Sequence, residues 1–319
     1  MLMRYIFNIL LVLSCLQLQA QDSIITHGFP LGSQPLQKNK GGKRIPLVAA
    51  TNIVAYGGAM IGLYATWYKN YPQGNFHFFN DNKEWLQVDK AGHTWSAYTE
   101  GRVCMALWEW AGLSGKKSIW IGGLSGLGYQ SIIEVLDGFS SEWGFSWGDY
   151  LGNMTGTVLL IGQELGWREQ RIQLKFSSHR KSYGNDILNQ RANDIYGIDL
   201  PQRILKDYNA QTYWLSVNLH SFFKNAKIPV WLNIAAGYGA ENMFGAVDNK
   251  WIDKNGAVTD YSAIRRYRQF YIAPDVDLTK IKTKSKVLKT MFFILNSFKF
   301  PTPSLELSNS RIKWNWIHF

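Results

Sequence analysis

The spacing of apolar residues changes near residue 170, and this change constrains the fold more than any other feature of the chain. Before it, long apolar stretches of helical length follow one another. After it, apolar and polar residues alternate with the period of two that is typical of strands. The pattern therefore predicts an α+β protein, with a helical domain over residues 46–168 and a β-rich region over residues 169–319.

Four helices are predicted in the first domain, and the first of them is long enough to cross a bilayer. Their ranges are Leu47–Tyr68, His93–Leu113, Ser118–Leu136 and Asp149–Leu165. Small residues four positions apart let helix backbones approach closely. The last two helices contain such pairs, Gly122 with Gly126 and Gly152 with Gly156. We therefore expect a four-helix bundle that is associated with a membrane or embedded in it, and a soluble bundle is the alternative.

The second region contains about five or six candidate strands, fewer than the eight of the smallest membrane barrels. The clearest of them cover Tyr213–His220, Trp231–Gly237, Gln269–Leu278 and Ile312–Phe319. A further amphipathic helix is predicted over Ser285–Ser297, before two prolines. We expect a small sheet packed on the helices, and a small outer-membrane β-barrel is the alternative.

Residues 1–20 have the pattern of a secretory signal peptide. Arg4 precedes an apolar stretch that is too short for a stable membrane span, and Ala20 stands before a polar segment. An alternative is that Val12–Cys15 acts as a lipobox, which would make Cys15 a lipidated N-terminus. Both interpretations predict export to the periplasm or to a membrane of the cell envelope. Residues 21–45 are polar, with scattered glycine and proline, and are predicted to be flexible.

The formal net charge of +11 limits the choice of partners. No nucleic-acid-binding motif accompanies the basic residues, so we expect no nucleic acid. Anionic lipid head groups or envelope glycans suit an exported basic protein better. The partner predicted here is therefore membrane lipid or envelope glycan, and the sequence leaves the oligomeric state open.

Five polar residues of the helical domain are candidates for a common site. Asp89 and His93 are four residues apart, as are Asp149 and Asn153, so each pair shares a helix face. Glu134 lies between isoleucine and valine, where a carboxylate is costly to bury without a partner. Ser146 precedes Asp149 by three residues, which is the spacing of a helix cap.

These side chains allow three interpretations. A histidine with carboxylates can bind a divalent metal ion, and His93, Glu134 and Asp149 are the candidate ligands. The same groups could do general acid–base chemistry. Alternatively, they satisfy one another and the helix ends, for example with Asp89 paired to Lys90 or Arg102. No His-Glu-x-x-His spacing is present, so the sequence alone leaves enzyme activity open.

The order of these motifs resembles a family of predicted periplasmic lipoproteins of unknown function. The resemblance rests on Asp89-Lys90-x-x-His93, then a helix with Glu134, then Ser146-Trp-x-Asp149 and a helix with Asn153, and it covers roughly residues 85–165. The same order is similar to that of VanZ-like membrane proteins. Neither resemblance implies a catalytic role. The chain departs from the small family members in its long C-terminal extension and in lacking a good lipobox.

Two functions follow as hypotheses for this envelope protein. The first is a structural or binding role at a membrane, through a helical core with a buried network of Asp89, His93, Glu134, Asp149 and Asn153. The second is a membrane-proximal enzyme or metal-binding protein that acts on a lipid-linked or cell-wall substrate.

Overall fold

A computed structural model describes residues 44–66, 68–253 and 256–318. The predicted signal peptide, Cys15 and almost all of the flexible segment lie outside these residues. The described chain combines helices and strands, so the prediction of an α+β protein is confirmed. It divides into two compact units, one with residues up to Asn80, Ser96–Gln170 and Thr283–Met291, the other with Asp81–Trp95, Arg171–Lys282 and Phe292–Phe319.

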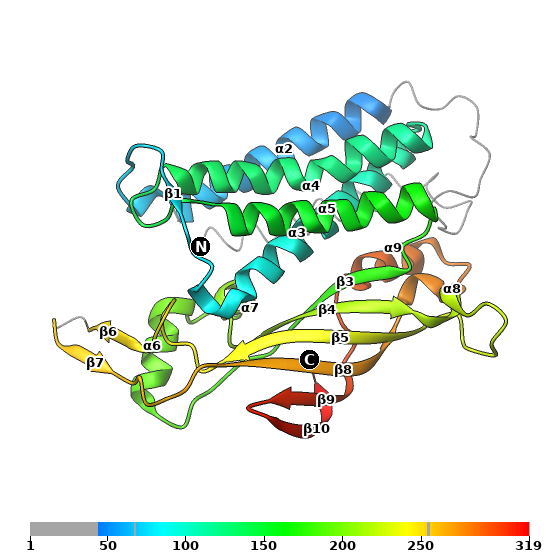
Figure 1. The fold of residues 1–319 in the computed structure, drawn as a ribbon. Helices are drawn as coiled ribbons and strands as arrows, with labels where there is room; N and C mark the ends of the chain where they lie inside the picture. Colours follow the sequence, from blue (N-terminus) through cyan, green and yellow to red (C-terminus); the bar gives the residue numbers. More distant parts are fainter. Residues whose placement is uncertain (1–43, 67, 254–255, 319) are drawn as a thin grey trace. The chain divides into compact units, whose positions relative to one another are not determined.

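Four long helices correspond to the four predicted ones, and all lie in the helical unit except the first part of the second helix, which belongs to the second unit (Figure 1). They are α2 (Arg44–Thr66), α3 (Val88–Trp110), α4 (Gly115–Gly138) and α5 (Trp147–Gly166). Short elements connect them: η2 (Tyr68–Asn70), β1 (Phe78–Phe79) and β2 (Phe145–Ser146). The predicted start of the second helix was wrong, because α3 begins five residues earlier, directly after the short η3 turn (Glu84–Gln87).

Glycines of α4 set the distance between α3 and α4. A Cβ atom on Gly126 would lie 2.1 Å from the carbonyl oxygen of Ala97, and one on Gly122 would lie 2.3 Å from Cα of Met105. No larger residue fits at either position without moving a helix backbone. The close approach predicted from their spacing is therefore observed. Gly152 and Gly156 of α5 are also buried.

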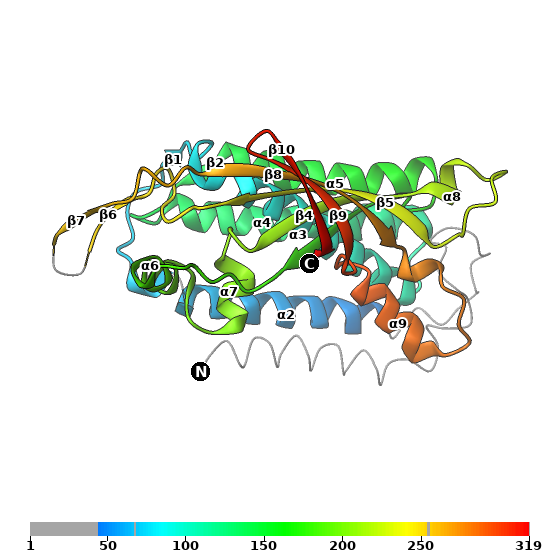
Figure 2. The same ribbon diagram turned by 90° about the horizontal axis from the view of Figure 1, so that it is seen from below.

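The second unit is built on a six-stranded sheet in the order β10-β9-β8-β5-β4-β3, with antiparallel neighbours throughout. The hairpin β9–β10 crosses β8 at a steep angle in Figure 2. The sheet order ends at β3 and β10, so the described residues form an open sheet and not a closed barrel. Its strands are β3 (Ile172–Ser178), β4 (Gln211–Asn218), β5 (Leu232–Glu241), β8 (Tyr267–Val276), β9 (Thr302–Ser308) and β10 (Arg311–His318).

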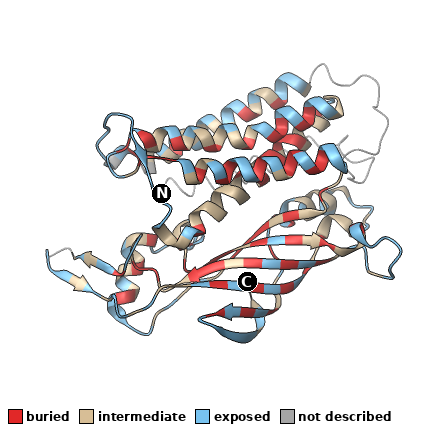
Figure 3. Ribbon diagram, viewed as in Figure 1, coloured by how far each residue is buried: buried red, intermediate tan, exposed pale blue. Residues whose placement is uncertain are grey.

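Buried and exposed residues alternate along the central strands β4, β5, β8 and β9, as Figure 3 shows, whereas β10 has no buried residue over Arg311–His318. One continuous row across the sheet illustrates the buried face. Lys175 lies opposite Trp214, and the row continues through Gly237, Tyr271 and Glu306. A side chain at Gly237 would lie 2.7 Å from the indole ring of Trp214, so this position requires glycine.

Two strands of the six-stranded sheet, the short strands outside it and several helices were not predicted. β3 alternates as a strand should, but Gln173 and Lys175 gave it the composition of a loop. β9 contains Pro303, which argues against a strand by composition. The region also holds more helix than predicted: α6 (Asp186–Tyr196), α7 (Leu200–Lys206), α8 (Leu219–Phe222) and η4 (Leu278–Lys280). The remaining elements are α9 (Lys286–Leu295), which was predicted, and the hairpin of β6 (Lys250–Ile252) with β7 (Val258–Asp260).

Candidate metal centre

Three helices supply the side chains of the candidate site. The unit boundary falls within α3, between Trp95 and Ser96, but α3 is one uninterrupted helix (Figure 1). His93 lies one turn before Ala97, the residue that packs against Gly126 of α4. The position of His93 therefore follows from the close packing of α3 on α4.

The chain enters α3 through a short left-handed turn. Trp85, Leu86 and Gln87 have φ angles of 45°, 50° and 68°, in the left-handed region that costs each residue about 1 kcal/mol. The backbone N–H of Trp85 donates to the carbonyl of Ala246 at 2.7 Å, and the hydroxyl of Tyr238 donates to the carbonyl of Leu86. These contacts fix the turn and hence the start of the helix that carries Asp89 and His93.

Ser146 connects the other two helices at the site. Its hydroxyl oxygen accepts from the backbone N–H of Asp149 at 3.1 Å and caps α5, as its spacing predicted. Its own backbone N–H donates to Oε2 of Glu134 on α4 at 3.3 Å. The backbone before it is held by the parallel pairing of β1 with β2. One residue thus positions both carboxylates.

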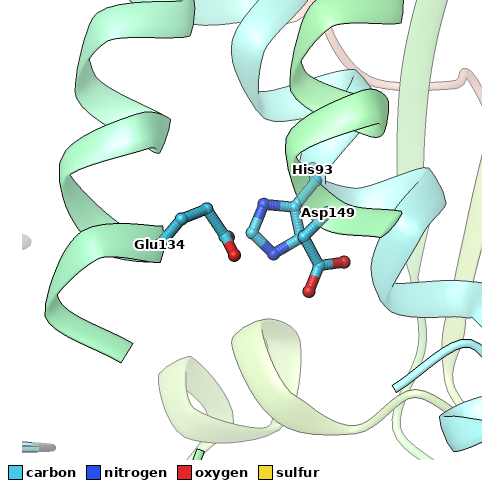
Figure 4. Close-up of side chains that lie close together, drawn as sticks. All are labelled: His93, Glu134 and Asp149. Atoms are coloured by element: carbon cyan, nitrogen blue, oxygen red, sulfur yellow. The ribbon is translucent and has the colours of Figure 1, made fainter. Parts of the chain in front are cut away.

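The structure brings four of the five predicted residues together in two groups, and three of them form the first group. His93, Glu134 and Asp149 each offer a ligand atom, and these atoms all lie within 4.8 Å of one another. Figure 4 shows the carboxylate of Glu134 directed toward the imidazole of His93, with Asp149 beside the ring. Glu134 and Asp149 are buried and His93 is half-buried.

A second group shares a member with the first. Ligand atoms of Asp81, Asp89 and Asp149 also lie within 4.8 Å of one another, so Asp149 belongs to both groups. Lys90 forms ion pairs with Asp81 at 2.6 Å and with Asp89 at 3.0 Å. The sequence-based pairing of Asp89 with Lys90 is therefore observed. Asp81 was missed, because a single aspartate in a loop has no periodic signal.

We call these six side chains, Asp81, Asp89, Lys90, His93, Glu134 and Asp149, the acidic cluster. They hold four carboxyl groups against one ammonium group and one imidazole. Burying carboxylates without balancing charge is costly, and a divalent cation would offset that cost. Asn153, the fifth predicted residue, is buried one turn after Asp149 on α5.

The spacing of the three ligand atoms can be compared with a real metal site. In a tetrahedral zinc site with metal–ligand distances of about 2.0–2.2 Å, the ligand atoms are roughly 3.3–3.6 Å apart. Atoms within 4.8 Å of one another need only a small side-chain adjustment to reach this spacing. Imidazole with carboxylate is a ligand set that suits zinc and other first-row divalent ions.

Comparisons with known proteins place the whole site within one family match. Residues 76–161 match the sequence profile of a family described as "Predicted periplasmic lipoprotein (DUF2279)". This range contains all six side chains of the acidic cluster, and Asn153. No curated protein and no solved structure matches the chain. The resemblance to VanZ-like membrane proteins stays a prediction.

The family match supports the resemblance deduced from the motifs, and its description agrees with the export signal predicted at the N-terminus. Residues 76–161 are similar to a family of predicted periplasmic lipoproteins, and the protein is an exported protein of the cell envelope.

Proposed function

We propose that this envelope protein binds a divalent metal ion in its helical core, at a membrane. The observation that carries the proposal is the convergence of His93, Glu134 and Asp149, whose ligand atoms lie within 4.8 Å of one another. The burial of Glu134 and Asp149 beside His93 supports it, since a bound cation would lower the cost of burying the two carboxylates.

Membrane association is supported by the first helix. In the part of the chain that the structure describes, Arg44–Ala65 is the one helix that is long and apolar enough to cross a membrane, and 11% of its most apolar window is buried. Its buried side carries Val48 and Asn52, and Asn52 lies 3.9 Å from the thiol of Cys104 on α3. Its exposed side carries Ile53, Val54 and Ile61. We propose that α2–α5 form a membrane-associated bundle.

Metal binding can be measured directly on the full chain. The protein, purified in mild detergent and dialysed against Zn²⁺, should retain metal by elemental analysis. Cobalt substituted for zinc should give the visible absorption of a low-symmetry site. We expect His93→Ala, Glu134→Gln and Asp149→Asn each to weaken Zn²⁺ affinity by at least about tenfold, because each removes a ligand.

The chain offers matched controls in the same unit. His77 and Glu142 are exposed residues outside the acidic cluster, so His77→Ala and Glu142→Gln should leave Zn²⁺ affinity unchanged. Equal affinities for His93→Ala and His77→Ala would refute the proposal. If the cluster is only a structural network, the site variants should lower the melting temperature without any metal dependence.

The same geometry leaves a second hypothesis, because three protein ligands leave room for a water molecule on the metal. Activation of that water would make the protein a hydrolase of a lipid-linked or cell-wall substrate. Metal binding is the step that both hypotheses share, so its measurement comes first.

A further inference from the structure

The sheet has an inverted distribution of polar and apolar side chains. Its buried face holds one small apolar cluster, around Trp214 and Tyr271, and is otherwise mostly polar. One row of this face crosses from β3 to β9 through Ser177, Thr212, Gly239, Gln269 and Ser308, and all of its side chains are polar. A sheet of a water-soluble protein normally buries its apolar face and exposes its polar one. Here the polar face is the buried one.

Buried ionic groups hold this polar face together. Lys175 forms an ion pair with Asp275 at 2.8 Å, and both side chains are fully buried. Gln173 donates to Asp277 at 2.8 Å and accepts from Asn296 at 2.7 Å. We call the six residues Lys175, Asp275, Lys299, Gln173, Asn296 and Asp277 the lysine network. Its dense bonding fixes the polar side as the inside of this unit.

The opposite face, here called the outer face, is apolar in unbroken rows. One row crosses all six strands through Leu174, Leu215, Ala236, Ile272, Leu305 and Trp314. The neighbouring row crosses them through Phe176, Tyr213, Tyr238, Phe270, Leu307 and Ile312. Charged side chains are absent from both rows. Ile272, near the centre, is 57% exposed.

Part of the outer face is covered within its own unit. The aromatic end near Tyr213 and Tyr238 packs against Val88 at the start of α3 and against Met243. The aliphatic part stays exposed and contains a groove of about 290 Å³. Its walls come from strands β5, β8, β9 and β10 and include Ile234, Ile272, Leu305 and Trp314.

We propose that the exposed part of the outer face lies against the hydrocarbon of membrane lipids. Strands next to lipid alternate with a period of two, with polar residues facing inward and apolar residues facing the lipid. A surface that binds a protein partner typically has polar groups around an apolar centre. Trp231, Trp314 and Trp316 are exposed near this surface, and tryptophan favours the boundary between lipid and water.

The strand edges decide how this face meets the bilayer. The edge of β3 is partly covered, because the backbone of Phe176 exchanges hydrogen bonds with Ser297 and Lys299. β10 is the last strand of the described sheet, so its outer edge has backbone groups to be satisfied by water. Such an edge is not tolerated inside hydrocarbon. The sheet therefore rests on the bilayer with its apolar side chains inserted, and does not cross it.

The test uses the full chain in vesicles of phosphatidylethanolamine and phosphatidylglycerol, in a background that carries Cys15→Ser and Cys104→Ser. Single cysteines replace Ile272 and Leu305 on the outer face and carry an environment-sensitive fluorophore. Ile198 and Ile252 are matched controls, because they are isoleucines of the same unit that are 69% and 70% exposed away from the outer face. Nitroxide-labelled lipid and aqueous iodide serve as the two quenchers.

At Ile272 and Leu305 we expect loss of emission with nitroxide lipid and little loss with iodide, and the reverse at Ile198 and Ile252. Iodide quenching at Ile272 equal to that at Ile252 would overturn the proposal. Protection from both quenchers, with cross-linking that depends on protein concentration, would also overturn it and identify a second copy as the occupant. Zn²⁺ binding is measured on the same samples, so this result and that of the metal proposal are independent.

Discussion

The acidic cluster and the lysine network are both buried and polar, yet they balance charge differently. The lysine network sets two lysines against two aspartates, with Lys299 at 3.7 Å from Asp275. The acidic cluster sets four carboxyl groups against Lys90 and His93. The first consists of ion pairs and amide hydrogen bonds alone, whereas the second brings an imidazole and two carboxylates close enough to share one ion. Buried polarity alone therefore does not mark a site; the convergence of metal-ligand atoms is the feature on which the proposed site rests.

The largest expected effect concerns the contribution of the lysine network to stability. Lys175→Met leaves the fully buried Asp275 with the hydrogen bond from Ser216 and, as its charged partner, the more distant Lys299. We therefore expect a loss of about 3 kcal/mol in the free energy of unfolding. Urea unfolding in mild detergent measures it. The control Lys250→Met breaks an ion pair of exposed side chains with Asp260 and should cost less than about 1 kcal/mol. Equal losses for the two variants would contradict the role of the network.

The second prediction concerns the packing that assembles the acidic cluster. Gly126→Ala forces a Cβ atom against the carbonyl of Ala97, and we expect destabilisation by about 2 kcal/mol together with weaker Zn²⁺ binding. Gly128→Ala is the control, since nothing lies within 4 Å of its added Cβ, and better helix propensity should stabilise it by up to about 1 kcal/mol. The two glycines are two residues apart on one helix, so a shared outcome would rule out the packing argument.

The third prediction concerns the pH dependence of the stability of the sheet. Burial lowers the pKa of His318 to about 4, with His179 as a further cause, while its ring stacks on Tyr271. Between pH 6.5, the ordinary pKa of histidine, and pH 4, the folded state therefore binds fewer protons than the unfolded state. Stability from this group is present above pH 6.5 and is lost as the pH falls toward 4.

We expect this loss to be between about 1 and 2 kcal/mol, allowing for the partial exposure of the ring. Melting temperatures are measured at pH 7.5, 5.5 and 4.0 for the wild-type chain and for His318→Gln. The loss appears as a steeper fall of melting temperature with falling pH in the wild-type chain. Identical pH profiles would show that His318 has no part in acid sensitivity.

The smallest expected effect concerns the left-handed turn before α3. Gln87 is exposed with a φ of 68°, so Gln87→Gly should raise stability by about 0.5 kcal/mol, and Gln87→Ala should leave it unchanged. Thermal melting measures both. A loss of stability in Gln87→Gly would mean that the Gln87 side chain, and not the turn, matters at the start of α3.

Two residues illustrate what the pattern could predict about the site. Ser146 was recognised as a cap from its spacing to Asp149, because a cap is a local hydrogen bond. Its second contact, to Glu134, joins residues on separate helices and had no local signal. The six strands show the same limit: β5 and β8 were visible as alternation, whereas β3 and β9 were hidden by a lysine and a proline.

The sequence by itself predicted the signal peptide, and it determined the long helices and the alternation of the central strands, because the backbone imposes periods of 3.6 and two on any segment that buries one side. Only the tertiary structure decided that Glu134 meets His93 and Asp149, and that Asp81 and Lys90 join them. Such contacts depend on how closely the helices pack, which is set here by glycines whose positions admit no side chain. No local sequence pattern encodes a distance between separate helices.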